Sequence, residues 1–228
     1  MPEPREILEK KKRPLRIAVV GIDGTGKSTA GNTIEKVLSK KYTVSHIRPL
    51  PTQENNHRIT RKLKKLQDKG HKENRPDIIF LTQLLHAPSM PFTRIKREKK
   101  SDVIIHDRHM LIDGEVYAKE YVPGRLKSAK YLTGTPKPDI IVHLRCDCER
   151  AYKRIIERQL NKDPKKKVLH IHETPEKIKE ASKKFDEVMS KIEKKHPEIK
   201  ILRIDSDQPK KKMLEELEQK IKDITIQQ

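Results

Sequence analysis

Short apolar runs alternate with longer segments of mixed polarity along the chain. The short runs are rich in Val, Ile and Leu, as buried strands are, and they cover residues 15–20, 42–47, 103–106, 138–144 and 199–204. The longer segments are typical of helices, and they cover 27–40, 54–69, 92–100, 111–121, 124–132 and 148–160, with further helices beginning near 76, 175 and 209. This alternation predicts an α/β fold with a right-handed, doubly wound parallel sheet of about five strands and helices on both faces.

Residues with strong local preferences mark the ends of several helices. Gly70 is expected to end the helix over 54–69, because glycine adopts the left-handed conformation that often follows a helix. Asp147 is a natural N-cap for the helix at 148–160, and Thr174 serves the same purpose for the long helix after it.

One folded unit is expected over residues 15–228, preceded by a basic arm over 1–14. Residues 160–173 are polar and rich in lysine, which suits a lid over an active site, although a plain surface loop explains that composition equally well. No apolar run has the length of a membrane span, and the first residues lack the apolar core of a secretory leader. A protein without membrane contact is therefore expected.

The composition limits the classes of partner and the cellular compartment that are expected for this protein. Only 33% of the 228 residues are hydrophobic and 4% are aromatic, so the core must be aliphatic and lean. A net charge of +20 favours anionic partners, and nucleotide, RNA and polyphosphate all remain open. Cys146 and Cys148 form a single C-x-C pair, which provides neither a disulfide framework nor a four-ligand zinc site. Reduced thiols and a cytoplasmic location are therefore expected.

The most specific motif follows the first predicted strand. It fits G-x-x-x-x-G-K-[ST] and comprises Gly21, Ile22, Asp23, Gly24, Thr25, Gly26, Lys27, Ser28 and Thr29. Glycines let successive backbone N–H groups point at one anion, and the following helix adds its positive end. Lys27 is expected to reach the β- and γ-phosphates of a nucleoside triphosphate, and Ser28 to ligate Mg²⁺. The motif therefore predicts an ATP-binding phosphate loop, or P-loop.

Two charged residues stand at the end of the third predicted strand. Asp107 follows a compact apolar run and is placed to hold Mg²⁺ together with Ser28, while Arg108 is a permanent cation that suits an acceptor phosphate. Ligands of open parallel sheets gather at the carboxyl ends of the strands, so both residues should lie beside the P-loop. A local ion pair at a strand end is the alternative.

Three arginines recur every fourth residue on the helix at 148–160. They place guanidinium groups on one helix face that leads into the expected lid. Arg154 and Arg158 are the candidates for neutralising charge on the transferred phosphoryl group, and a solvated helix face is an equally good interpretation.

The order of these motifs resembles the thymidylate kinase family of nucleoside monophosphate kinases. The resemblance rests on the P-loop with its internal Asp23, on Asp107-Arg108, on Pro138-Asp139 before a strand, and on Glu149-x-Ala151-x-x-Arg154 after that strand. It implies transfer of the ATP γ-phosphoryl group to dTMP with Mg²⁺, and a tendency to form homodimers.

The same resemblance implies roles for single residues. Asp23 would lie near the acceptor sugar and the metal, Asp107 would serve the metal, and Arg108 would meet the acceptor phosphate. Arg48 is a candidate acceptor ligand. Phe80 falls where the family stacks an aromatic ring on the base, although an apolar core position explains it equally well.

The departures from the family pattern lie on the acceptor side. Arg48 is displaced by one position, Gln83-Leu84 lacks the family's arginine, and His109 replaces a tyrosine. The serine-containing segment that follows is Leu111-Ile112-Asp113-Gly114. ATP use is therefore expected, while the acceptor is open.

Two other functions remain as alternatives to the nucleoside monophosphate kinase. One is a polyphosphate-dependent nucleotide kinase, because such proteins are similar around these motifs and the net charge suits a polyanion. The other is a basic ATP-binding protein that acts on RNA or DNA. The scarcity of aromatic residues argues against stacking on single strands, so nucleic acid is the less favoured partner.

Overall fold

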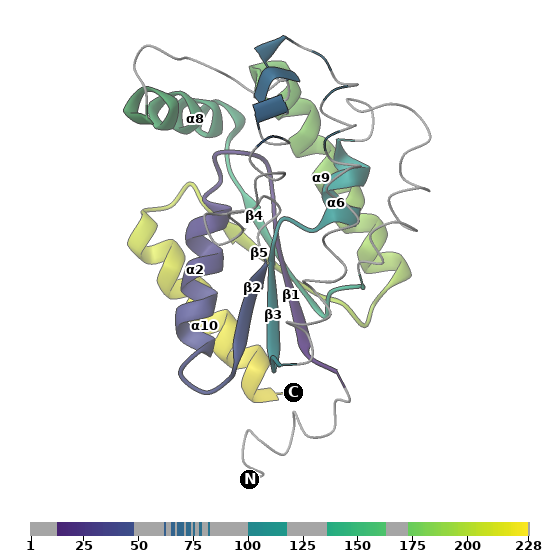
Figure 1. Cartoon of the computed structure of the whole chain (residues 1–228). Coiled ribbons are helices and arrows are strands. Elements are labelled where there is room, and N and C mark those ends of the chain that lie inside the picture. The colour runs from purple at the N-terminus through teal and green to yellow at the C-terminus, as the bar shows by residue number, and fades with distance from the viewer. Residues whose placement is uncertain are drawn as a thin grey trace.

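The computed structural model describes residues 13–47, 100–117, 136–162 and 173–227, with single residues and short pieces between 62 and 82. Five strands form one parallel sheet: β1 (Leu15–Val20), β2 (Val44–Ile47), β3 (Val103–Asp107), β4 (Ile140–Arg145) and β5 (Lys200–Asp205). Their order is β2-β3-β1-β4-β5 (Figure 1). Because the chain builds one side of β1 first and then the other, the sheet is doubly wound, as the sequence predicts.

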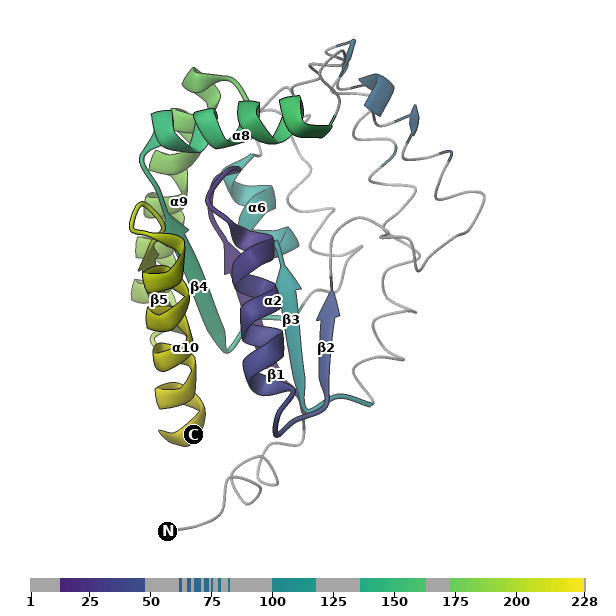
Figure 2. The same ribbon diagram turned by 90° about the vertical axis from the view of Figure 1, so that its left-hand side faces the viewer.

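One face of the sheet is covered by α2 (Lys27–Leu38) and α10 (Lys210–Gln227) (Figure 2). Alternate side chains of the buried strands point toward these two helices, beginning with Leu15, Ile17 and Val19 of β1. The helix residues that pack against these strands are apolar and lie three or four positions apart within each helix: Ala30, Ile34, Leu38, Met213, Leu217, Ile221 and Ile224. This periodicity buries one stripe of each helix and leaves the charged residues outside.

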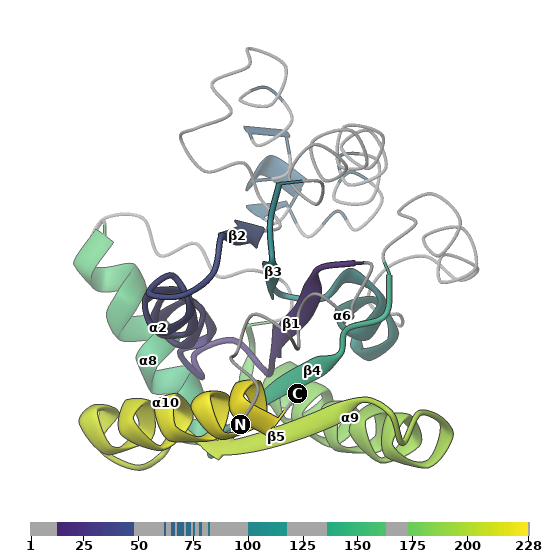
Figure 3. The same ribbon diagram turned by 90° about the horizontal axis from the view of Figure 1, so that it is seen from below.

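The opposite face is covered by α6 (Met110–Val116) and α9 (Pro175–Lys195) (Figure 3), and Ala151 and Ile155 of α8 (Cys148–Lys162) join the same core cluster. Its core contains Ala18 and Val20 of β1 and is centred on Phe185 of α9, which is fully buried. In Figure 2, α8 runs across the top of the sheet, where the parallel strands end. That placement brings the arginine helix to the edge at which the P-loop begins.

The expected caps of α8 and α9 are confirmed. Asp147 Oδ1 accepts hydrogen bonds from the backbone N–H groups of Glu149 and Arg150, both at 3.0 Å. Thr174 caps α9 by accepting from the Lys177 N–H group at 3.3 Å. These side chains satisfy amides that have no partner within the helix, so they fix where each helix begins.

Some predicted elements are shifted or lie elsewhere. The helix expected over 111–121 is the shorter α6, and the end expected at Gly70 is wrong, because this buried glycine is itself helical. The helices expected over 92–100 and 124–132, most of the expected lid, and residues 1–12 of the arm lie outside the described residues. Among the helices that are described, none is long and apolar enough to cross a membrane.

Candidate active site

The P-loop follows β1 and turns on glycines that other residues would strain. Gly21, Gly24 and Gly26 have φ values of 145°, 86° and 87°. A Cβ on Gly24 would stand 2.3 Å from the carbonyl oxygen of Ala151 in α8, whereas nothing lies within 4 Å of one on Gly26. Gly26 is also the N-cap of α2, and no side chain caps this helix. The loop therefore presents backbone at a helix N-terminus, which is the arrangement that binds phosphate.

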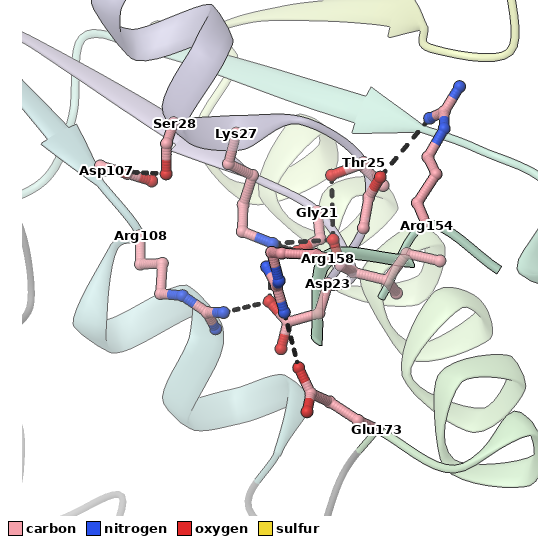
Figure 4. Close-up of polar contacts among 12 residues, drawn as sticks. Gly21, Asp23, Thr25, Lys27, Ser28, Asp107, Arg108, Arg154, Arg158 and Glu173 are labelled. Atoms are coloured by element: carbon pink, nitrogen blue, oxygen red, sulfur yellow. Dashed lines mark hydrogen bonds and ion pairs between the residues drawn. The ribbon is translucent and has the colours of Figure 1, made fainter. Parts of the chain in front are cut away.

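Lys27 is buried inside this loop (Figure 4). Its ammonium donates to the carbonyl oxygens of Gly21 and Ile22, at 2.9 and 2.7 Å, and lies 3.2 Å from Asp23 Oδ1. Burial lowers the pKa of Lys27, and the Asp23 carboxylate counteracts this in part. The loop thus surrounds the Lys27 ammonium with oxygen atoms, and phosphate oxygens of a bound nucleotide can take the place of these oxygen atoms.

The two predicted metal ligands meet. Ser28 Oγ donates to Asp107 Oδ2 at 2.9 Å across the end of the sheet (Figure 4). The sheet explains this contact, because α2 begins directly after the P-loop that follows β1, and β1 is the neighbour of β3, with Val19 paired to Asp107. A hydroxyl and a carboxylate oxygen are ligands that Mg²⁺ prefers in phosphate sites, so the residues present fit this ion.

Arg108 turns from the end of β3 toward the P-loop. Its φ is 73°, the only positive value outside glycine in the described ranges, and its backbone N–H donates to Val19 O at 3.0 Å. Its guanidinium pairs with Asp23 Oδ1, so this carboxylate lies between Lys27 and Arg108. Burial opposes the charged form, but the charges of Asp23 and Asp113 prevail and raise the pKa of Arg108. A strained backbone that aims a permanent cation is typical of functional sites.

Arg154 and Arg158 of α8 contact different parts of the protein. Arg154 donates to Ser206 O at 2.9 Å and to Gly24 O at 3.4 Å, which ties α8 to the P-loop (Figure 4). Arg158 pairs with the buried Glu173 at 2.9 Å. The anchoring carbonyl of Ser206 and the partner Glu173 could not be found from the sequence, because neither belongs to a motif.

Asp113 is a further member of the site that motif analysis left without a role. Both of its carboxylate oxygens are buried and have no hydrogen-bond partner among the residues described, although part of the residue is exposed. Burial raises its pKa to about 6, against the charges of Arg108 and Lys27. The only signal in the sequence was its departure from the family's serine-containing segment.

Two of the remaining acceptor-side predictions are not tested by the described residues. Arg48 and Phe80 lie outside the described residues. His109 is buried and contacts Pro136 O through Nε2 at 3.2 Å, and its ring lies edge-on to His106. Its visible contacts are therefore with the protein interior.

Solved structures with a similar fold include three of deoxyadenosine kinase from M. mycoides. The structure with bound dCTP is 19% identical with a TM-score of 0.55, the structure with dCMP and a flexible dCDP is 18% identical with 0.62, and the structure with dATP is 20% identical with 0.61. They cover 91 to 92% of this chain, and 99 to 100% of each of those chains is covered. At this identity the likeness establishes the fold. No curated protein sequence matches.

The family model for thymidylate kinase matches residues 19–219. The match includes the P-loop, Asp107-Arg108 and the arginine helix, which are the elements that meet at the carboxyl edge of the sheet. Because the match spans most of the chain, this protein belongs to the thymidylate kinase family of nucleotide-dependent phosphotransferases.

Proposed function

We propose that this protein transfers the γ-phosphoryl group of ATP to a nucleoside monophosphate, with dTMP as the first acceptor to test. The observation that carries the proposal is the hydrogen bond between Ser28 and Asp107 beside Lys27 and Arg108. This hydrogen bond joins the phosphate loop to a metal-binding pair, and the strand-end cation Arg108 lies beside them at the same edge of the sheet. Family membership supports the same reaction class.

The residues of the site have distinct chemical tasks in this reaction. An oxygen of the acceptor phosphate attacks the γ-phosphorus as the bond to the bridging oxygen of ADP breaks, so negative charge moves onto the leaving diphosphate. Lys27 and the amides at the start of α2 bind the donor phosphates, and Arg108 binds the acceptor phosphate. Ser28 and Asp107 would hold Mg²⁺, which neutralises charge on the phosphate oxygens when bound.

The contacts of Asp23 give it a positioning task. Its carboxylate touches both Lys27 and Arg108 in this structure. Both cations must exchange some of these contacts for phosphate oxygens, and a carboxylate between them offsets their mutual repulsion and holds both side chains in one region.

Release of ADP from Mg²⁺ and ATP, measured with a panel of added acceptors, tests the proposal. The panel contains nucleoside monophosphates, the corresponding deoxynucleosides, polyphosphate and RNA. The deoxynucleosides are included because the neighbours of similar fold are named deoxyadenosine kinase. We expect a nucleoside monophosphate to stimulate turnover most, and stimulation by polyphosphate, RNA or nucleosides alone would contradict the proposal.

Two lysine variants of the same helix provide the control. Lys27→Ala removes the ammonium that the P-loop encloses and should reduce stimulated turnover by a factor of about 100 or more. Lys36→Ala removes an exposed lysine of α2 and should leave turnover unchanged. Equal effects of the two substitutions would show that Lys27 has no special part in the reaction.

A further inference from the structure

The strands of the sheet begin at the edge opposite the active site, which we call the amino edge, and Figure 3 views the molecule from this side. Backbone hydrogen bonds join the segments that enter neighbouring strands. The N–H of Asp102 donates to Thr43 O and the N–H of Leu15 to Asp102 O, both at 2.9 Å. On the other side of β1, the N–H of Asp139 donates to Arg16 O at 2.8 Å. The entrances of β2, β3, β1 and β4 therefore lie side by side in this order.

A basic residue precedes each of these four entrances by two positions along the chain. In the order of the strands they are Lys41, Lys100, Arg13 and Lys137, and all four are exposed. Neighbouring strands lie about 4.8 Å apart, so the four side chains start from a row about 14 Å long. Like charges in a row repel one another, and an arrangement of this kind favours an anionic partner.

The acids beside this row are engaged within the protein. Asp139 accepts two hydrogen bonds from the Arg13 guanidinium, at 2.7 and 3.0 Å, and Asp102 accepts one from the Thr43 N–H at 2.8 Å. The three lysines of the row, in contrast, pair with no carboxylate within the ranges that the structure describes. Their ammonium groups are therefore available to an anion outside the protein.

Further lysines border the row. Lys40 follows the end of α2, and Lys194 and Lys195 stand in the last turn of α9. Lysines near helix C-termini interact favourably with the helix dipole, so these three have an explanation within the fold. The dipole does not explain Lys137, which stands just before β4, or Lys200, which is the first residue of β5. The excess of lysine at this edge therefore exceeds what helix ends require.

The chemistry of this edge narrows the class of anion. The exposed large hydrophobic residues that the structure describes are Leu66 and Leu160, and neither belongs to the segments that form the edge. Protein interfaces and stable lipid anchoring normally need apolar side chains beside the charges, and single-stranded nucleic acid needs aromatic ones for stacking. A duplex needs only cations, because it carries a negative charge about every 1.7 Å along its axis.

We propose that the amino edge binds the phosphate backbone of double-stranded nucleic acid, with Lys41, Lys100 and Lys137 as direct phosphate contacts. These lysines recognise charge and not bases, so the binding does not depend on nucleotide sequence. The surface goes beyond the proposed phosphoryl transfer, because it lies at the other end of the strands from the P-loop (Figure 2). A protein held on a duplex in this way keeps its active site open to nucleotides.

Fluorescence anisotropy with two labelled duplexes of unrelated sequence tests the proposal. We expect the full-length protein to bind both with similar affinity, and the affinity to fall steeply as the salt concentration rises, because binding releases counterions from the phosphates. Addition of ATP and Mg²⁺ should not displace the duplex, since the P-loop lies at the opposite edge.

A triple variant removes the three contacts together: Lys41→Gln, Lys100→Gln and Lys137→Gln. At about 50 mM salt we expect the affinity for both duplexes to fall by about 10- to 100-fold. Each lost phosphate contact reduces the slope of log K against log salt by about 1, so the slope of the variant should be shallower by about 3.

A second triple variant makes the same change in net charge elsewhere. It alters exposed lysines of α8 and of the first turns of α9 and α10: Lys153→Gln, Lys179→Gln and Lys210→Gln. This control should bind both duplexes with nearly the affinity and the salt dependence of wild type. Thermal unfolding verifies that both variants are folded.

The inference is overturned if wild type does not bind a duplex at low salt, if the two triple variants lose affinity equally, or if ATP displaces the duplex. Vesicles that contain anionic phospholipid provide the last comparison, and binding to vesicles without binding to a duplex would also overturn it. None of these results bears on the proposed function, because the assays measure binding and involve no turnover.

Discussion

At the scale of single residues, Gly24 and Gly26 have the same backbone conformation but different surroundings. Their φ values are 86° and 87°, yet only Gly24 faces a carbonyl oxygen, that of Ala151. A side chain at a positive φ costs about 1–3 kcal/mol, so Gly26→Ala should reduce the free energy of unfolding by about that amount. Gly24→Ala should reduce it by more, because its Cβ also meets the Ala151 carbonyl. Urea unfolding measures both, and equal losses would contradict the packing of the P-loop on α8.

Arg108 is best tested by a substitution that respects its backbone. Glycine adopts the observed φ of 73° without strain, so Arg108→Gly separates loss of the guanidinium from loss of backbone geometry better than alanine does. We expect kcat/KM for the acceptor to fall by a factor of about 100 or more, while the affinity for ATP is kept.

Arg203→Gly, at an exposed arginine paired with Glu193 outside the site, is the control for that experiment. Loss of ATP affinity in Arg108→Gly, with the acceptor parameters unchanged, would show that the guanidinium serves the donor instead.

The role of a single residue could be predicted from the sequence only where its partners lie in the same motif or at a predicted strand end. The tasks of Lys27 and Ser28 follow from a motif of nine consecutive residues, and Asp107 follows from a strand end, so their proximity could be predicted. The contacts of Arg154 with Ser206, and the lack of a hydrogen-bond partner for the Asp113 carboxylate within the described part of the chain, depend on packing between distant segments. No local pattern records such packing.

At the scale of elements, the contact of α2 with β2 depends on a missing side chain. A Cβ on Gly31 would lie 2.9 Å from the His46 imidazole, and Glu35 holds that ring through a contact of 2.8 Å at Nδ1. Glycine to alanine normally stabilises a helix by about 1 kcal/mol. Here we expect Gly31→Ala to destabilise the protein by about 1–3 kcal/mol, because the ring must move.

A double-mutant cycle with His46→Ala isolates this contact. With the imidazole removed, Gly31→Ala should become neutral or stabilising in urea unfolding, because its Cβ then has room. The same destabilisation in both backgrounds would mean that the His46 ring is not the obstacle.

Elements could be predicted well where the sequence contains a cap or a continuous apolar run. Asp147 and Thr174 start α8 and α9 as expected, since capping is a local interaction. Gly70 was misleading because a glycine is tolerated within a helix as well as at its end, and the burial of this glycine is not visible in a short window of sequence. The order of the strands needed the pairing of distant segments.

At the scale of the whole molecule, a buried histidine makes stability depend on pH. His143 of β4 packs on Phe185, and burial lowers its pKa to about 4, while Asp186 opposes this and Arg145 and Arg203 add to it. The unfolded chain takes up the proton near pH 6.5 and the folded protein only near 4, so stability falls as the pH drops through this interval.

Between pH 7 and pH 5 we expect wild type to lose about 2 kcal/mol more of its free energy of unfolding than His143→Leu. Asp113 acts in the opposite direction, since its raised pKa stabilises the folded state as the pH falls through about 6. That contribution is present in both proteins and cancels in the comparison. Equal losses in the two proteins would show that His143 is not held neutral by burial.

The net charge of the whole molecule is compatible with the proposed phosphoryl transfer, but it does not identify the substrate. A net charge of +20 attracts nucleotides, polyphosphate and RNA alike. On α10 several lysines pair with glutamates one turn away, as Lys220 does with Glu216. What selects among the anions is therefore the geometry at the carboxyl edge of the sheet rather than the sum of the charges.

That geometry is tested most directly by following the phosphoryl group itself. With ATP radiolabelled at the γ-phosphate, a nucleoside monophosphate and Mg²⁺, wild type should produce a labelled nucleoside diphosphate, and Asp107→Asn should reduce the rate by a factor of about 100 or more. Label that appears only in free phosphate, or transfer that is as fast in Asp107→Asn as in wild type, would contradict a kinase centre built on Lys27, Ser28 and Asp107.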